Sequence, residues 1–159
     1  MQKFSTFLWF NDQAEEAAKF YTSLFANSRL GKTVHISGAG PEGKDVVQLV
    51  EFAMNGQEFT AFNGGPYCTF NDAVSFVVHC DNQDELDHYW KKLTADGGQE
   101  VQCGWLKDKF GVSWQIVPSI LPQLVSKGDQ ARTKSMMDAL RTMKKLDIAG
   151  LQQAYEAGV

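Results

Sequence analysis

The side chains that could do chemistry in this chain are neutral polar groups and one histidine, placed at alternating positions of predicted strands. Ser75 and His79 are four residues apart, and Ser113 and Gln115 are two apart, so each pair shares one strand face. Hydroxyl and amide groups exchange hydrogen bonds without carrying charge. His79 could serve as a general base or a metal ligand, but a single imidazole is more typical of a hydrogen-bonded core or cleft residue.

The carboxylates that stand out have structural explanations. Asp12 and Asp81 each precede a predicted helix, so we expect them to be N-caps rather than an acid–base pair. Glu51 and Glu58 flank a predicted hairpin, and we expect both to be solvated. No catalytic residue is assigned from these patterns.

Composition limits the classes of partner. The 159 residues carry 15 Lys and Arg against 19 Asp and Glu, a net charge of −4, without the basic cluster that a nucleic-acid groove needs. No stretch resembles a signal peptide or approaches the roughly 20 apolar residues of a membrane span. We expect a cytoplasmic protein with neither nucleic-acid nor membrane partners. The absence of a CxxC pair predicts small core or cavity-lining roles for the three cysteines, Cys68, Cys80 and Cys103.

The elements that must position these residues follow a β-α-β-β-β order in the first half. Aromatic and β-branched residues predict strands at 3–10, 30–37, 46–54 and 58–63. Apolar residues at helical spacing after Asp12 predict a helix behind the first strand. Asn55-Gly56 predicts a tight hairpin, and residues 38–43 predict a flexible turn.

The second half repeats that order. Residues 4–12 lie over residues 73–81 without a gap, and the same offset superposes the apolar faces of the two helices, the second spanning 83–96. Strands are predicted at 100–103, 105–107 and 111–117, with a turn in which Asp108 can bond its own backbone and Gly111 can take φ > 0. We therefore divide the chain into a module at 1–64, a connector at 65–72, a module at 73–118 and a helical tail at 119–159.

The helical tail is expected to pack on the sheet or on a second subunit. Residues 129–146 place Met136, Leu140 and Met143 on one stripe, and Asp147 can cap a last helix. Methionine also suits adaptable interfaces, so we expect a homodimer. Pairing of the two modules within one chain and a domain-swapped dimer both remain open.

Together these features resemble the vicinal oxygen chelate (glyoxalase/bleomycin resistance/dioxygenase) superfamily, and within it the PhnB-like group, often labelled 3-demethylubiquinone-9 3-methyltransferase. The resemblance implies an α+β fold in which two βαβββ modules form a curved mixed sheet around a cleft, followed by C-terminal helices. It rests on Phe10-Asn11, Glu15-Glu16-Ala17, Phe20-Tyr21, Asn63-Gly64-Gly65-Pro66, Gly104-Trp105, Phe110-Gly111-Val112-Ser113-Trp114-Gln115-Ile116 and Leu146-Asp147-Ile148.

The resemblance also implies where a metal would bind. Metal-using members take ligands from the first and last strands of each module, and these positions fall on Thr6, Ser75, Thr60 and Gln115. All four side chains are neutral and would compensate poorly for the lost hydration of a divalent ion. We therefore expect neither a metal nor another cofactor.

The leading hypothesis is a protein that binds a small, aromatic or uncharged molecule in an aromatic-lined cleft. The candidate cleft residues are Thr6, Trp9, Thr60, Phe62, Ser75, His79, Trp105, Ser113 and Gln115.

Two enzyme hypotheses stay open, and whether the chain catalyses a reaction is undecided at this point. One is a lyase, isomerase or dioxygenase of the same superfamily, using His79 or a substrate-bridged metal. The other is the methyltransferase of the family label. Its common cofactor site is a Gly-rich strand-to-helix turn, whereas the glycines at 38–40 lie between two strands, so we expect the label to be a family name only.

Overall fold

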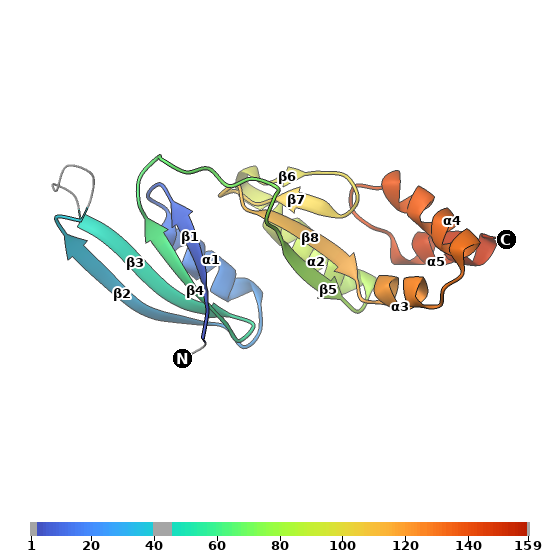
Figure 1. The fold of residues 1–159 in the computed structure, drawn as a ribbon, viewed down its shortest axis with the longest axis horizontal. Coiled ribbons are helices and arrows are strands. Elements are labelled where there is room, and N and C mark those ends of the chain that lie inside the picture. The colour runs from blue at the N-terminus through green and yellow to red at the C-terminus, as the bar shows by residue number, and fades with distance from the viewer. Residues whose placement is uncertain (1–2, 40–45, 159) are drawn as a thin grey trace. The chain divides into compact units, whose positions relative to one another are not determined.

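The computed structural model describes residues 3–39 and 46–158, and these residues fall into two compact units that divide between Thr69 and Phe70 (Figure 1). Each unit contains one four-stranded mixed sheet. The expected turn at 38–43 lies outside the described residues from residue 40 onward.

The first unit has the predicted β-α-β-β-β order. Its elements are β1 (Thr6–Phe10), α1 (Ala14–Leu24), β2 (Arg29–Ser37), β3 (Val46–Met54) and β4 (Gln57–Asn63). The sheet order is β1-β4-β3-β2, with β1 parallel to β4 and the other neighbours antiparallel. The Asn55-Gly56 hairpin is confirmed, since both residues have positive φ, 49° and 79°.

The core of the first unit lies between α1 and one face of the sheet. Tyr21 is fully buried and stacks on Phe52 with ring centroids 6.2 Å apart, and Phe52 stacks on Phe59 at 5.1 Å. Ala14, Ala17 and Ala18 bring the helix close to the strands because their side chains are small. We call the opposite face of this sheet the first open face; Phe7, Trp9, Glu51, Thr60 and Phe62 belong to it.

The second unit repeats the arrangement with shorter strands. Its elements are β5 (Phe76–Cys80), α2 (Gln83–Leu93), a 3-10 turn (Ala95–Gly97), β6 (Gln99–Glu100), β7 (Trp105–Lys107) and β8 (Ser113–Pro118), in the sheet order β5-β8-β7-β6. The predicted strand 100–103 is reduced to two residues, and the helix ends at Leu93 rather than at 96. The sheet buries Leu106, Trp114 and Ile116 toward α2.

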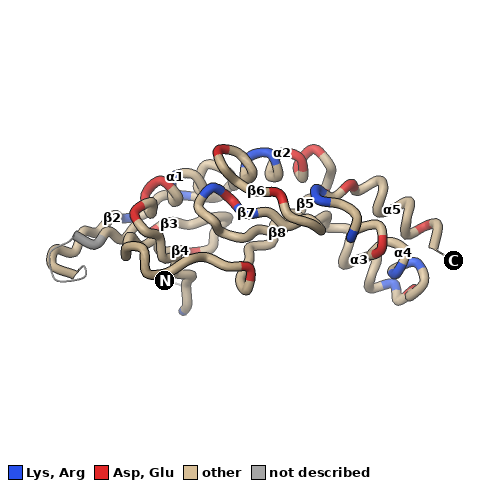
Figure 2. Tube along the Cα trace, turned by 90° about the horizontal axis from the view of Figure 1, so that it is seen from above, with Lys and Arg blue, Asp and Glu red and all other residues tan. Residues whose placement is uncertain are grey.

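We call the face of this sheet turned away from α2 the second open face; it carries Ser75, Val77, His79, Trp105, Lys107, Ser113 and Gln115. Charges on α2 are ordered by sign (Figure 2): acidic residues occupy the first turn and Lys91 and Lys92 the last. This order complements the helix dipole.

Three helices complete the second unit: α3 (Ile120–Ser126), α4 (Gln130–Arg141) and α5 (Ile148–Ala157). Asp147 is the N-cap of α5, as predicted, and accepts a hydrogen bond from the Ala149 N–H at 3.1 Å. Helix α3 was not anticipated from the sequence, and the predicted helix 129–146 ends at Arg141. Met136 and Leu140 are buried, as the apolar stripe predicted.

The predicted caps of the first two helices were wrong by one residue. The N-cap of α2 is Asn82, whose side chain accepts from the Glu85 N–H at 2.9 Å, and not Asp81. The N-cap of α1 is Gln13, which makes no side-chain cap, and not Asp12. A side chain from another strand supplies the bond instead, because Asn63 Oδ1 accepts from the Ala14 N–H at 2.7 Å.

The gapless overlay of the two modules was also wrong at the strands. The helices correspond residue by residue from Ala14 and Gln83. Thr60 and Gln115 each stand four residues after a hairpin glycine, and their parallel neighbours are Phe7 and Val77. The first strands are therefore shifted by one residue relative to the helices. Because side chains alternate between the two faces of a strand, this one-residue shift places each matched residue of the first strands on the face opposite to the one that the overlay predicted.

Candidate functional site

Three of the predicted cleft residues meet at the centre of the second open face. Gln115 on β8 lies directly opposite Trp105 on β7, and Gln115 Nε2 donates to Ser75 Oγ at 2.9 Å. The alternate residues of β8, Trp114 and Ile116, are buried toward α2, so Gln115 points away from that helix. The structure thus brings a hydroxyl, an amide and an indole together.

Ser113 is also on this face, but its hydroxyl already has a partner. Ser113 Oγ donates to Asp72 Oδ1 at 2.6 Å, and Lys107 Nζ lies 3.3 Å from the same oxygen. The Ser113 hydrogen bond, followed by Lys107, lowers the pKa of the Asp72 carboxyl. Asp72 and Lys107 were not anticipated from the sequence, although the hairpin register, which pairs Lys107 with Ser113, could have indicated the lysine.

His79 lies on the same open face, opposite Val117, and is exposed. For His79 to bind a metal ion, further imidazole or carboxylate ligands would have to lie beside it. Within residues 3–39 and 46–158, no three His, Cys, Asp or Glu side chains come together in a way that could hold a metal ion.

The first open face carries an aromatic cluster of Phe7, Trp9 and Phe62. The Phe62 ring centroid lies 5.4 Å from that of Phe7 and 4.7 Å from that of Trp9, the latter pair edge to face. Trp9 Nε1 donates to the Gly65 carbonyl at 3.0 Å. A Cβ on Gly64 would lie 2.2 Å from Phe62 Cε1 and 2.4 Å from Trp9 Cε2, so the chain can pass over these rings only with a glycine there.

Thr6, one of the candidate cleft residues, lies on the face of the first sheet turned toward α1 and not on the first open face. It pairs with buried Phe59 and shares its strand face with Leu8 and Phe10, which are buried toward α1. Thr60 is on the opposite face, with Phe7 as its β1 neighbour. The error follows from the gapless overlay. Ser5, one residue earlier, lines the hollow of the first open face together with Thr60.

That hollow has a volume of about 560 Å³. Two small residues belong to its lining: Ala53, and Gly31, where a Cβ would lie 2.9 Å from the Glu51 carbonyl oxygen. Its remaining lining combines aromatic, polar and charged groups: Lys3, Phe4, Ser5, Arg29, Glu51, Phe52, Glu58, Phe59 and Thr60. Glu51 is exposed, as expected, and Glu58 is half-buried, but their position beside this hollow was not anticipated. The register around Asn55-Gly56, which pairs Glu51 with Thr60, could have indicated it.

At the positions where metal-using members of the vicinal oxygen chelate superfamily have ligands, this chain has residues that do not suit a divalent ion. Thr60 and Gln115 offer a hydroxyl and an amide, and their β1 and β5 neighbours are Phe7 and Val77. Neutral or apolar side chains at these positions cannot replace the carboxylate and imidazole ligands that such an ion prefers.

Comparison with known proteins gives a consistent picture. The model of the family described as 3-demethylubiquinone-9 3-methyltransferase matches residues 2–117. A solved structure described as a putative 3-demethylubiquinone-9 3-methyltransferase, PhnB protein, from Bacillus cereus is 37% identical, with a TM-score of 0.65. The match covers 74% of this chain and 100% of that one. No match was found among curated proteins.

Two more distant structures share the fold. The fosfomycin resistance protein FosX from Mesorhizobium loti has a TM-score of 0.55 at 11% identity, covering 79% of this chain and 99% of that one. Protein PA1353 from Pseudomonas aeruginosa has a TM-score of 0.54 at 18% identity, covering 74% and 98%.

Proposed function

The chain belongs to the 3-demethylubiquinone-9 3-methyltransferase (PhnB-like) family and has the vicinal oxygen chelate fold, and on this premise we propose that its open sheet faces bind a small, aromatic or uncharged molecule without a metal ion. The observation that carries the proposal is the same in both units. A neutral polar residue at the centre of the open face lies directly beside an aromatic one, Thr60 beside Phe7 and Gln115 beside Trp105.

Such a pair suits a planar ligand. The ring provides a stacking surface, and the hydroxyl or amide provides a directional hydrogen bond without the desolvation cost of a charge. In the second unit the bond between Gln115 and Ser75 fixes the amide beside Trp105.

A thermal-shift screen of neutral aromatic compounds tests the proposal, because a ligand that binds the folded state raises its apparent stability. For a compound that binds, Gln115→Leu should weaken binding about ten-fold, the effect of one lost hydrogen bond. Gln153→Leu, an exposed change on α5, is the matched control. Equal affinity of wild type and Gln115→Leu for every binding compound would contradict a role for this face.

Metal analysis of the protein purified without chelator tests the second part of the proposal. We expect no stoichiometric transition metal, and we expect Gln115→Glu to create no metal site while Ser75 and Val77 remain its neighbours. Stoichiometric metal that Gln115→Leu releases would contradict the proposal.

A charged ligand is a second candidate for the first open face, because four charged side chains line its hollow: Lys3, Arg29, Glu51 and Glu58. Arg29→Met and Glu51→Gln distinguish the candidates. A neutral ligand should bind both variants as it binds wild type, whereas an ionic ligand should lose affinity in one of them and lose it further as salt is added.

The family description names a methyltransferase, and isothermal calorimetry with S-adenosylmethionine tests that activity directly. The proposal predicts no saturable heat of binding. Tight, saturable binding would favour the methyltransferase instead.

A further inference from the structure

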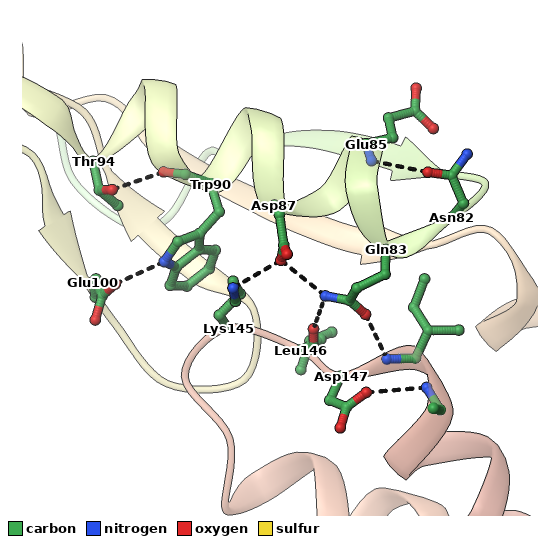
Figure 3. A network of polar contacts seen from close by, with 12 residues as sticks. Asn82, Gln83, Glu85, Asp87, Trp90, Thr94, Glu100, Lys145, Leu146 and Asp147 are labelled. Atoms are coloured by element: carbon green, nitrogen blue, oxygen red, sulfur yellow. Dashed lines mark hydrogen bonds and ion pairs between the residues drawn. The ribbon is translucent and has the colours of Figure 1, made fainter.

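One side chain joins the last helix of the chain to α2 (Figure 3). Gln83 Nε2 donates to the Leu146 carbonyl at 3.1 Å, and Gln83 Oε1 accepts from the Ile148 N–H at 2.9 Å. Asp87, one turn further along α2, accepts from Gln83 Nε2 at 2.9 Å and pairs with Lys145 Nζ at 2.8 Å. We call these five residues the latch: Gln83, Asp87, Lys145, Leu146 and Ile148.

The segment that the latch holds also supports the turn before β7. The Cys103 and Gly104 N–H groups donate to the Met143 and Lys144 carbonyls, both at 2.8 Å. Cys103 and Gly104 have positive φ, 64° and 81°, and left-handed backbone is unfavourable for a cysteine. The two hydrogen bonds to the tail therefore stabilise a turn that the local sequence alone does not favour.

Leu146 adds a packing contact to the same turn. Its side chain is 1% exposed, and a Cβ on Gly104 would lie 3.0 Å from Leu146 Cδ1. The Gly104 carbonyl accepts from the Ile116 N–H at 2.8 Å, so Gly104 is held between β8 and the tail.

Trp105 follows this turn directly and begins β7 opposite Gln115. We propose that Gln83 is a positioning residue: by holding residues 143–148 against the turn at Cys103-Gly104, it sets the position of Trp105 on the second open face. The tail, which lies outside the residues matched by the family model, thereby controls affinity at the candidate site. Only this last consequence rests on the proposed function.

The test uses the full chain labelled with 5-fluorotryptophan. Trp105→Phe assigns the Trp105 fluorine resonance, and Trp9, in the first unit, serves as an internal reference. Gln83→Leu removes all three hydrogen bonds of the Gln83 side chain at similar side-chain size. Gln153→Leu, the same substitution at an exposed position of α5, is the control. We expect Gln83→Leu to shift or broaden the Trp105 resonance and to leave that of Trp9 in place. An unchanged Trp105 resonance would overturn the inference.

Lys145→Met is a milder second variant, since it removes only an ion pair whose side chains are 43% and 46% exposed. If Gln83→Leu does not fold, this variant should still displace the Trp105 resonance slightly, and the absence of any displacement would overturn the inference.

Binding of 2-naphthol, a neutral aromatic probe, separates the inference from the proposed function. We expect Gln83→Leu to weaken its binding about five-fold, the lower end of coupling between distant sites. A displaced Trp105 resonance together with no 2-naphthol binding by wild type would support the positioning role and count against the ligand. Unchanged 2-naphthol affinity in Gln83→Leu would overturn control by the tail.

Discussion

Asp108 shows how much of the β7–β8 hairpin depends on one carboxylate. It is 3% exposed, and its Oδ1 accepts from the Phe110 and Val112 N–H groups at 2.9 and 3.0 Å. Its Oδ2 accepts from Trp114 Nε1 at 2.8 Å. The hydrogen bonds within its own turn were predicted from the sequence. The hydrogen bond to the Trp114 indole was not, because it depends on how β8 folds back along β7.

Asp108→Ala should lower the free energy of unfolding by roughly 3 kcal/mol, because it removes the buried acceptor of three donors. Asp108→Asn should also lower the free energy of unfolding, since the asparagine amide can place a second hydrogen-bond donor opposite the Trp114 Nε1–H. Urea denaturation measures both. Asp12→Ala is the control, because Asp12 is exposed and does not cap α1, and it should change stability by less than about 0.5 kcal/mol. Equal effects of Asp108→Ala and Asp12→Ala would contradict this role.

The cysteines differ in reactivity because they differ in burial. Cys80 is 1% exposed, and burial, with smaller contributions from Glu85 and Asp81, raises the pKa of its thiol to about 12. Cys68 is exposed, contrary to the expectation from sequence that all three cysteines are core or cavity-lining residues. The thiolate is the reactive form.

At pH 8 a maleimide should therefore modify Cys68 and leave Cys80 unmodified in the native protein, as mass spectrometry of digested samples would show. The sign of the pH effect follows from the raised pKa: above pH 9 the unfolded chain loses this proton while the folded chain keeps it. Stability should consequently fall from pH 9 upward, and Cys80→Ala should reduce that fall. Modification of Cys80 as fast as Cys68 would contradict the assignment.

Among the elements, α1 could be predicted from the sequence, but the residue that caps it could not. The helix was predicted because its apolar spacing is local information. Its cap was predicted wrongly because Asn63, which provides it, lies on β4 and is far away in sequence. Thr6 was placed on the wrong face for a different reason: the loop before α1 is one residue longer than the loop before α2, so β1 and β5 do not share the offset of the helices.

Asn63→Ala should destabilise the first unit by about 1 kcal/mol, the usual value of an N-cap hydrogen bond. Asn63→Asp retains the acceptor for the Ala14 N–H and loses the donation from Nδ2 to Gln48 Oε1, so it should retain part of the stability. Hydrogen exchange at Ala14 reports the cap directly. Unchanged exchange there in Asn63→Ala would show that Asn63 does not cap the helix.

For the whole molecule, the order of elements and the duplication could be predicted because hydrophobic period and turn residues repeat along the chain. The hollow could not, because its lining comes from the N-terminal segment, β2, β3 and β4 and depends on their register. Of the nine candidate residues, Ser75, Trp105 and Gln115 lie together on the second open face, whereas Thr6 lies on the face of the first sheet turned toward α1. Ligand binding by the remaining eight stays a prediction.

The two units should also differ in their response to acid. Hydrogen bonds and ion pairs lower the pKa of Asp72, Asp87 and Asp138 in the second unit and of Glu15 in the first, led by Ser113, Lys145, Lys134 and Lys19 respectively. A lowered pKa stabilises the folded state above the unfolded value, 3.8 for Asp and 4.5 for Glu, and this contribution is lost as pH falls through the folded value. Each of these carboxylates is solvent-accessible, so salt should reduce the effect.

In an acid titration of the protein labelled with 5-fluorotryptophan, the Trp90, Trp105 and Trp114 resonances should leave their native positions at a higher pH than the Trp9 resonance does. Asp87→Asn should narrow the difference, because its amide does not titrate. Loss of the Trp9 resonance first, or of all four together, would contradict this assignment of acid sensitivity to the second unit.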